Sequence, residues 1–170
     1  MHIIHQKGVG LVEVLVALLL LALGIFGFIA LQYKAGEATA EATQRIQAMN
    51  IARDLAERIR INNKANIDNY KATDFQKEES CFDSFCDPST KTKFDLYQVK
   101  LLANRFGMNY KVQNCPNSTT QNNRKCVYVA WDKTQPENTT QSDTNACTKS
   151  TSAGFSYNDA STCIVLEIYQ

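Results

Sequence analysis

Histidine is nearly absent from this chain: its only two histidines, His2 and His5, stand at the extreme N-terminus. Catalytic sets that use an imidazole as base, such as Ser-His-Asp or Cys-His, therefore have no candidate in the rest of the sequence. The carboxylates form no recognisable catalytic pair. We expect no catalytic residue and no cofactor, and we predict a protein that is not an enzyme.

An excess of charge of one sign is also missing. Lys and Arg number 18 against 17 Asp and Glu, which leaves a net charge of +1. Strong non-specific binding to nucleic acid requires many neutralised phosphates, so this balance argues against it, although not against a local basic patch. The basic residues that could form one are Lys91, Lys93, Lys100, Arg105, Lys111, Arg124 and Lys125. A solvated surface is the simpler interpretation, so DNA is an unsupported partner.

Cysteine is absent from the first 80 residues and then occurs six times, at Cys81, Cys86, Cys115, Cys126, Cys147 and Cys163. An even number confined to the polar part predicts three disulfides in an oxidising compartment. The alternative is zinc, which favours Cys-x-x-Cys spacing and histidine ligands. Here the closest cysteines have four residues between them and both histidines stand at the extreme N-terminus, so we predict no metal site. About fifteen pairings remain open. Our working assignment pairs Cys115 with Cys126 and Cys147 with Cys163, and Cys81 with Cys86 would close a small loop.

Charge is almost absent between Val9 and Leu31, where Glu13 is the only ionisable residue. As a helix, residues 9–31 would span roughly 35 Å, enough for a hydrocarbon core of about 30 Å. The run is longer than the apolar part of a signal peptide, which has about 7–15 residues. It predicts a membrane helix. Its weakly basic N-terminal flank favours a cytoplasmic N-terminus, and the cysteines favour an outside location for the rest.

Proline is absent from residues 32–62, where good helix formers dominate. We therefore predict one nearly continuous helix over residues 9–62, roughly 80 Å long, with three glycines as soft points. In its second half Asp54 and Arg58 stand four apart, in the favourable acid-before-base order. An apolar stripe is predicted at Ala42, Ile46, Met49, Leu55 or Ala56, and Ile59.

The remaining sequence predicts a small globular part. A short helix is expected over 93–106 with Gly107 as its C-cap, and strands over 108–113, 126–131 and 163–169. Residues 132–161 are polar and are predicted to form a long loop. The economical architecture is an α+β fold in which a long N-terminal helix packs on a small antiparallel sheet. The segments are then 1–8, 9–31, 32–62 and the disulfide-bonded head, 63–170.

Residues 7–18 read Lys-Gly-Val-Gly-Leu-Val-Glu-Val-Leu-Val-Ala-Leu, which resembles the type III signal of type IV pilins. The resemblance implies a leader of residues 1–8, cleavage between Gly8 and Val9 by a membrane peptidase, and methylation of the new terminus. It makes Glu13 the fifth mature residue. An acid costs about 2.5–3.5 kcal/mol at the centre of a membrane and less near its surface, so such residues are usually functional. Glu13 could pair with a neighbour's terminal amine; the simpler alternative is a solvated carboxylate without a role.

The predicted mature chain begins with Val9, whereas the mature chains of major pilins usually begin with Phe. Residues 9–18 instead resemble the minor-pilin subfamily called type IV pilus modification protein PilV. The stretch 52–62, Ala-Arg-Asp-Leu-Ala-Glu-Arg-Ile-Arg-Ile-Asn, resembles the same subfamily. The strand ending in Trp131 looks similar too. The resemblance covers residues 8–62 firmly and the head loosely.

The resemblance implies a minor pilin that primes pilus assembly near the tip and supports piliation, twitching motility and adhesion. Implied partners are other minor pilins, the major pilin, the prepilin peptidase/methyltransferase and the inner-membrane assembly platform. The chain would cross the bacterial inner membrane once, with its C-terminus periplasmic, and later lie in the extracellular pilus. Two alternatives remain: a pseudopilin of type II secretion, and a competence or DNA-uptake pilin whose 132–161 loop binds a ligand.

Overall fold

The computed structural model describes residues 10–71, 80–116, 118, 124–140, 145–151 and 154–169. The chain divides into two units, residues 1–42 and 43–170. The predicted leader, residues 1–8, lies outside the described residues.

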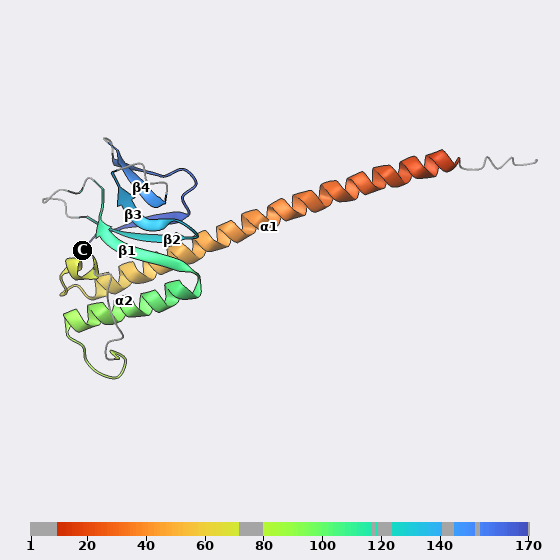
Figure 1. Ribbon diagram of the computed structural model, residues 1–170. Helices are drawn as coiled ribbons and strands as arrows, with labels where there is room; N and C mark the ends of the chain where they lie inside the picture. Colours follow the sequence, from red (N-terminus) through yellow and green to blue (C-terminus); the bar gives the residue numbers. More distant parts are fainter. Residues whose placement is uncertain are drawn as a thin grey trace, which may run out of the picture. The chain divides into compact units, whose positions relative to one another are not determined.

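Helix α1 runs from Leu11 to Ile61 without interruption (Figure 1). This agrees with the single helix predicted for residues 9–62. The glycines expected as soft points, Gly24, Gly27 and Gly36, all lie within continuous helix. The long run of strong helix formers and the absence of proline explain why one helix extends this far.

The buried face of α1 in the second unit consists of Ala48, Ile51, Ala52, Leu55 and Ile59. The predicted stripe was correct at Leu55 and Ile59 but began too early, because Ala42 is exposed and Ile46 is 63% exposed. Spacing alone cannot tell where a covering layer starts. The face that repeats at three and four residues is buried only from Ala48 onward.

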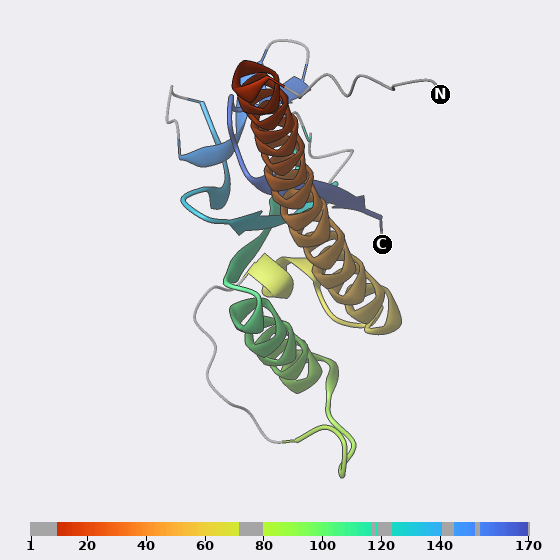
Figure 2. The same cartoon turned by 90° about the vertical axis from the view of Figure 1, so that its right-hand side faces the viewer.

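Two short helical elements follow α1. The first is a 3-10 helix, η1 (Ile67–Lys71), and Figure 2 shows it between α1 and the second element, α2 (Pro88–Arg105). Helix α2 begins five residues before its predicted start because Asp87 caps it, accepting the backbone N–H groups of Ser89 and Thr90. Pro88 suits the first helical position. The helix ends where predicted, before Gly107 with its φ of +66°.

The first sheet has three antiparallel strands in the order β1-β2-β6. These are β1 (Met108–Asn114), β2 (Lys125–Trp131) and β6 (Cys163–Ile168), close to the three predicted strands. The long N-terminal helix and this sheet confirm the predicted α+β arrangement of a pilin-like fold.

A second sheet corrects the prediction of a long loop over residues 132–161. Its strands are β3 (Gln135–Thr139), β4 (Ala146–Thr151) and β5 (Gly154–Tyr157), in the order β3-β4-β5. The pair β3–β4 is parallel and the pair β4–β5 antiparallel. These strands are rich in Thr, Ser and Asn and lack the apolar alternation by which a half-buried strand is predicted.

The central strand of the first sheet is covered on both faces, because every residue of β2 is buried. On one face Val127 and Val129 join a core with residues of α1 and α2, including Leu55 and Leu96. On the opposite face Tyr128 packs with four cysteines, among them Cys147 of β4. A strand that is covered on both faces has no solvent-facing side, so its residues need not alternate between apolar and polar.

Candidate functional site

The N-terminal turn of α1 contains Glu13. The carbonyl of Gly10 accepts the backbone N–H of Glu13 at 2.9 Å and that of Val14 at 3.4 Å, so the carboxylate lies in the first turn. A negative charge is favoured there because the helix dipole places partial positive charge at the N-terminus. The predicted cleavage and methylation site, Gly8 and Val9, lies outside the described residues.

The helix surface around Glu13 is apolar on all sides. From Leu11 to Leu31 the large apolar side chains are between 48% and 80% exposed, and the described residues contain one helix long and apolar enough to cross a membrane. An apolar surface of this size is unfavourable in water. It requires lipid or other apolar helices as its surroundings.

A buried polar cluster connects the second half of α1 to α2. We call it the Asp95 cluster; its members are Asp54, Arg58, Asn62, Tyr70, Lys91, Thr92 and Asp95. The Asp95 carboxylate is fully buried and accepts from Arg58 Nη1 at 3.1 Å and from Lys91 Nζ at 3.3 Å. Arg58 Nε also pairs with Asp54 at 3.0 Å, as the four-residue spacing predicted. Burial disfavours the guanidinium charge, but the two carboxylates outweigh it and raise the pKa of Arg58.

Tyr70 of η1 completes the cluster. Its hydroxyl donates to Asp95 Oδ2 at 3.2 Å and accepts from Asn62 Nδ2 at 3.1 Å. Asn62 Nδ2 also lies 2.9 Å from the carbonyl oxygen of Pro88 and 3.2 Å from Thr92 Oγ1. Burial, together with the nearby Asp95 charge, raises the pKa of Tyr70 to about 12. The cluster therefore holds α1, η1 and α2 together through buried hydrogen bonds.

Sequence reasoning identified only part of this cluster. Arg58 and Asn62 lie in the stretch 52–62 that suggested a minor pilin, but Asp95 and Tyr70 were not singled out. One signal was available: Asp95 stands between Phe94 and Leu96 on a predicted helix, where an isolated acid among apolar residues points to a buried partner.

Lys125 is a second buried charge and is 1% exposed. Its Nζ lies 2.7 Å from Asp68 Oδ1, and it also donates to Asn114. Asp68 also pairs with Lys71 at 2.7 Å. Hydrogen bonds from Lys125 and Lys71 lower the pKa of Asp68 to about 2.

Four members of the candidate basic patch pair with carboxylates. Lys91 contacts Asp95 and Lys125 contacts Asp68, as described above. The other two pairs are Lys111 with Glu137 at 3.2 Å and Arg124 with Glu167 at 2.9 Å. These carboxylates offset the positive charge that phosphate binding needs, so the structure adds no support for DNA as a partner.

Three disulfides join Cys81 to Cys86, Cys115 to Cys126, and Cys147 to Cys163, which is the working assignment made from the sequence. The second links the end of β1 to the start of β2. The third connects β4 to β6 and so ties the second sheet to the first. Within the described residues no group of three or more His, Cys, Asp or Glu side chains is arranged to hold a metal ion.

A comparison with known families gives a match to a pilin family. The model of the family described as Tt1218-like, type IV pilin Tt1218, matches residues 30–97. Every member of the Asp95 cluster falls inside this range. Comparisons with curated proteins and with solved structures found no match.

The long apolar N-terminal helix, the small sheets that follow it in the chain and this match support a type IV pilin-like protein. The particular family to which residues 30–97 are similar is the Tt1218-like type IV pilins. Such a protein has a structural role, in assembly with other pilins in a pilus, and the long apolar helix fits anchoring in a membrane.

Proposed function

We propose that this chain is a minor pilin of the PilV type, cut between Gly8 and Val9, N-methylated at Val9, and anchored by α1 before it enters a filament. The observation that carries the proposal is the placement of Glu13. It is the only ionisable group on the wholly apolar, exposed surface of α1 between Leu11 and Leu31. Such an acid is unfavourable in hydrocarbon unless a partner compensates its charge.

The compensating group in this proposal is the terminal amine of Val9 on a neighbouring subunit. Glu13 lies one helical turn from the proposed new terminus, so a small axial offset between two helices brings a carboxylate to an amine. The pair is desolvated only inside a bundle of such helices, where the attraction is stronger than in water. Glu13 thereby sets the stagger, and contacts between apolar helices replace contacts with lipid.

The proposed location is the bacterial inner membrane, crossed once with the C-terminus periplasmic, and afterwards the extracellular pilus. The proposed partners are other minor pilins, the major pilin, the prepilin peptidase/methyltransferase and the inner-membrane assembly platform. We propose that the protein primes assembly near the tip, supports piliation, twitching motility and adhesion, and carries out no enzymatic step.

The test compares Glu13→Gln with Glu37→Gln. Both replace a carboxylate by an isosteric amide on α1, but Glu37 is exposed beyond the apolar segment, where it pairs with Lys34 at 2.8 Å. We expect Glu13→Gln to be processed and retained in the membrane, yet to fall at least tenfold in sheared filaments. Glu37→Gln should enter filaments normally. Incorporation of Glu13→Gln at the wild-type level would refute the mechanism.

Intact-mass analysis of the membrane-extracted protein tests the processing independently. The expected mass lacks residues 1–8, carries one methyl group and shows no free thiol. A mature start near residues 37–41 would contradict the proposed anchor. A pseudopilin of type II secretion would give the same mass, and secretion genes instead of pilus genes beside this one would favour that alternative.

A further inference from the structure

Strand β6 is an unprotected edge of the first sheet. It pairs with β2 and lies at the end of the order β1-β2-β6. Natural edge strands are usually blunted by Lys, Pro or a bulge, because their free backbone groups attract other strands. The residues of β6, Cys163–Ile168, include neither Lys nor Pro, their register with β2 has no bulge, and Glu167 is their only charge.

The hydrogen-bond pattern shows which backbone groups of β6 are open. The N–H of Trp131 donates to the carbonyl of Thr162, and the register continues with Ala130 opposite Cys163. In an antiparallel pair the bonded residues alternate, so the backbone of Val165 and Glu167 faces away from β2. Consistently, the N–H of Val165 donates outward to the Tyr157 hydroxyl at 3.2 Å. At Glu167 no other described strand meets the edge.

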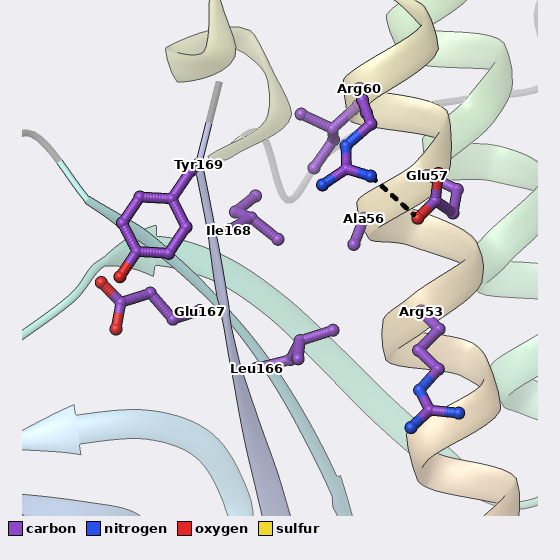
Figure 3. Close-up of a pocket in the computed structure, with 9 residues that line it drawn as sticks. Arg53, Ala56, Glu57, Arg60, Leu166, Glu167, Ile168 and Tyr169 are labelled. Atoms are coloured by element: carbon purple, nitrogen blue, oxygen red, sulfur yellow. Dashed lines mark ion pairs between the residues drawn. The ribbon is translucent and has the colours of Figure 1, made fainter.

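A groove of about 360 Å³ lies beside this open end of β6, between the strand and α1 (Figure 3). Leu166 and Ile168 point toward the helix, where Ala56 faces them, so the floor is apolar. The helix side carries positive charge. Arg60 pairs with Glu57 at 3.6 Å, whereas Arg53 has no ion-pair partner among the described residues.

We propose that this groove binds an extended segment of a neighbouring pilin subunit, which adds as a strand beside Glu167, inserts an apolar side chain over Ala56 and places a carboxylate on Arg53. The proposal rests on the proposed function, because it takes the occupant from the same filament. Arg53 and Arg60 are two helical turns, about 10 Å, apart. At about 3.3 Å per residue a strand of roughly three residues spans that distance. Backbone pairing supplies affinity, and the pocket and Arg53 supply selectivity.

The experiment places a photo-crosslinking benzoylphenylalanine at position 169, where Tyr169 lines the groove, in the full chain in its native membrane and with Arg53 intact. A matched probe at Asn104, an exposed position on α2, serves as control. We expect an adduct from position 169, but not from 104, and sequencing of the crosslinked peptide should identify an acidic, extended segment of another pilin's head. No adduct, an adduct with lipid, or one with a neighbour's apolar helix would overturn the inference.

A second variant tests the pocket. Ala56→Trp fills the floor, and we expect it to reduce the position-169 adduct at least tenfold while the amount of protein in the membrane and its disulfides stay unchanged. If Ala56→Trp fails to fold, reversal of the exposed charge by Arg53→Glu, with the probe at Tyr169, replaces it; an undiminished adduct then refutes the role of Arg53. The adduct is read in the membrane with Glu13 intact. Absence of the adduct would therefore refute the groove proposal alone. Normal filament entry of Glu13→Gln would refute the proposed function.

Discussion

Replacement of Asp95 by alanine would test whether the Asp95 cluster holds the head on α1. The substitution removes the carboxylate that accepts from Arg58, Lys91 and Tyr70, and leaves the buried Tyr70 hydroxyl without that acceptor. Removing one partner of a buried ion pair costs about 3–5 kcal/mol. Arg58 keeps Asp54 and is 30% exposed, so we expect the lower end, about 3 kcal/mol.

The matched control is Asp54→Ala, which removes the other carboxylate on the same guanidinium. The Asp54 side chain is 37% exposed, and a partly solvated pair of this kind contributes less than about 1 kcal/mol. The assay is denaturant unfolding of the full chain in detergent, with disulfides intact, followed by tyrosine and tryptophan fluorescence. Asp95→Asn should lower the free energy of unfolding by an amount between those of Asp95→Ala and Asp54→Ala, because the amide oxygen still accepts a hydrogen bond.

A double-mutant cycle of Asp95→Ala with Arg58→Ala isolates the pair. We expect a coupling energy of about 1–3 kcal/mol, as found for residues in one buried network. If Asp95→Ala destabilised the head no more than Asp54→Ala, or if the cycle showed no coupling, the cluster would not be what joins α2 and η1 to α1.

Three further predictions concern the head. The pKa of Tyr70 in the folded protein, about 12, lies above its ordinary value of 10.0. Its contribution to the free energy of unfolding is therefore complete below pH 10 and is lost as the pH rises toward 12. Tyr70→Phe should make unfolding less pH-dependent in that range. The pKa of Asp68 is lowered from 3.8 to about 2, so its contribution is present above pH 4 and is lost between about pH 4 and 2. Because the Asp68 side chain is 44% exposed, Asp68→Asn should reduce the fall in the free energy of unfolding between pH 4 and 2 by less than about 1 kcal/mol. Replacing Cys147 and Cys163 together by serine should cost about 3 kcal/mol and raise amide exchange in β4 and β5, whereas unchanged exchange would contradict a tie between the sheets.

Local sequence was sufficient for the long helix. The absence of proline, the strong helix formers and the apolar run from Val9 to Leu31 act on near neighbours, and α1 accordingly runs over Leu11–Ile61. The same local reasoning placed the end of α2 at Gly107 and the three strands of the first sheet. The spacing of Gly8, Val9 and Glu13 is likewise a property of the sequence alone, and it is the basis of the proposed processing and assembly.

Tertiary structure decided the rest, because it depends on residues far apart in the chain. Strands β3 to β5 are polar, and their pairing, including the parallel pair β3–β4, follows no local pattern. Once they cover the first sheet, β2 becomes buried on both faces. Asp95 and Arg58 are 37 residues apart, so their ion pair forms only when α2 packs on α1. Without that pair a buried carboxylate would destabilise the fold. The open edge at Glu167 exists for the same reason: which strand ends a sheet is fixed by the whole fold.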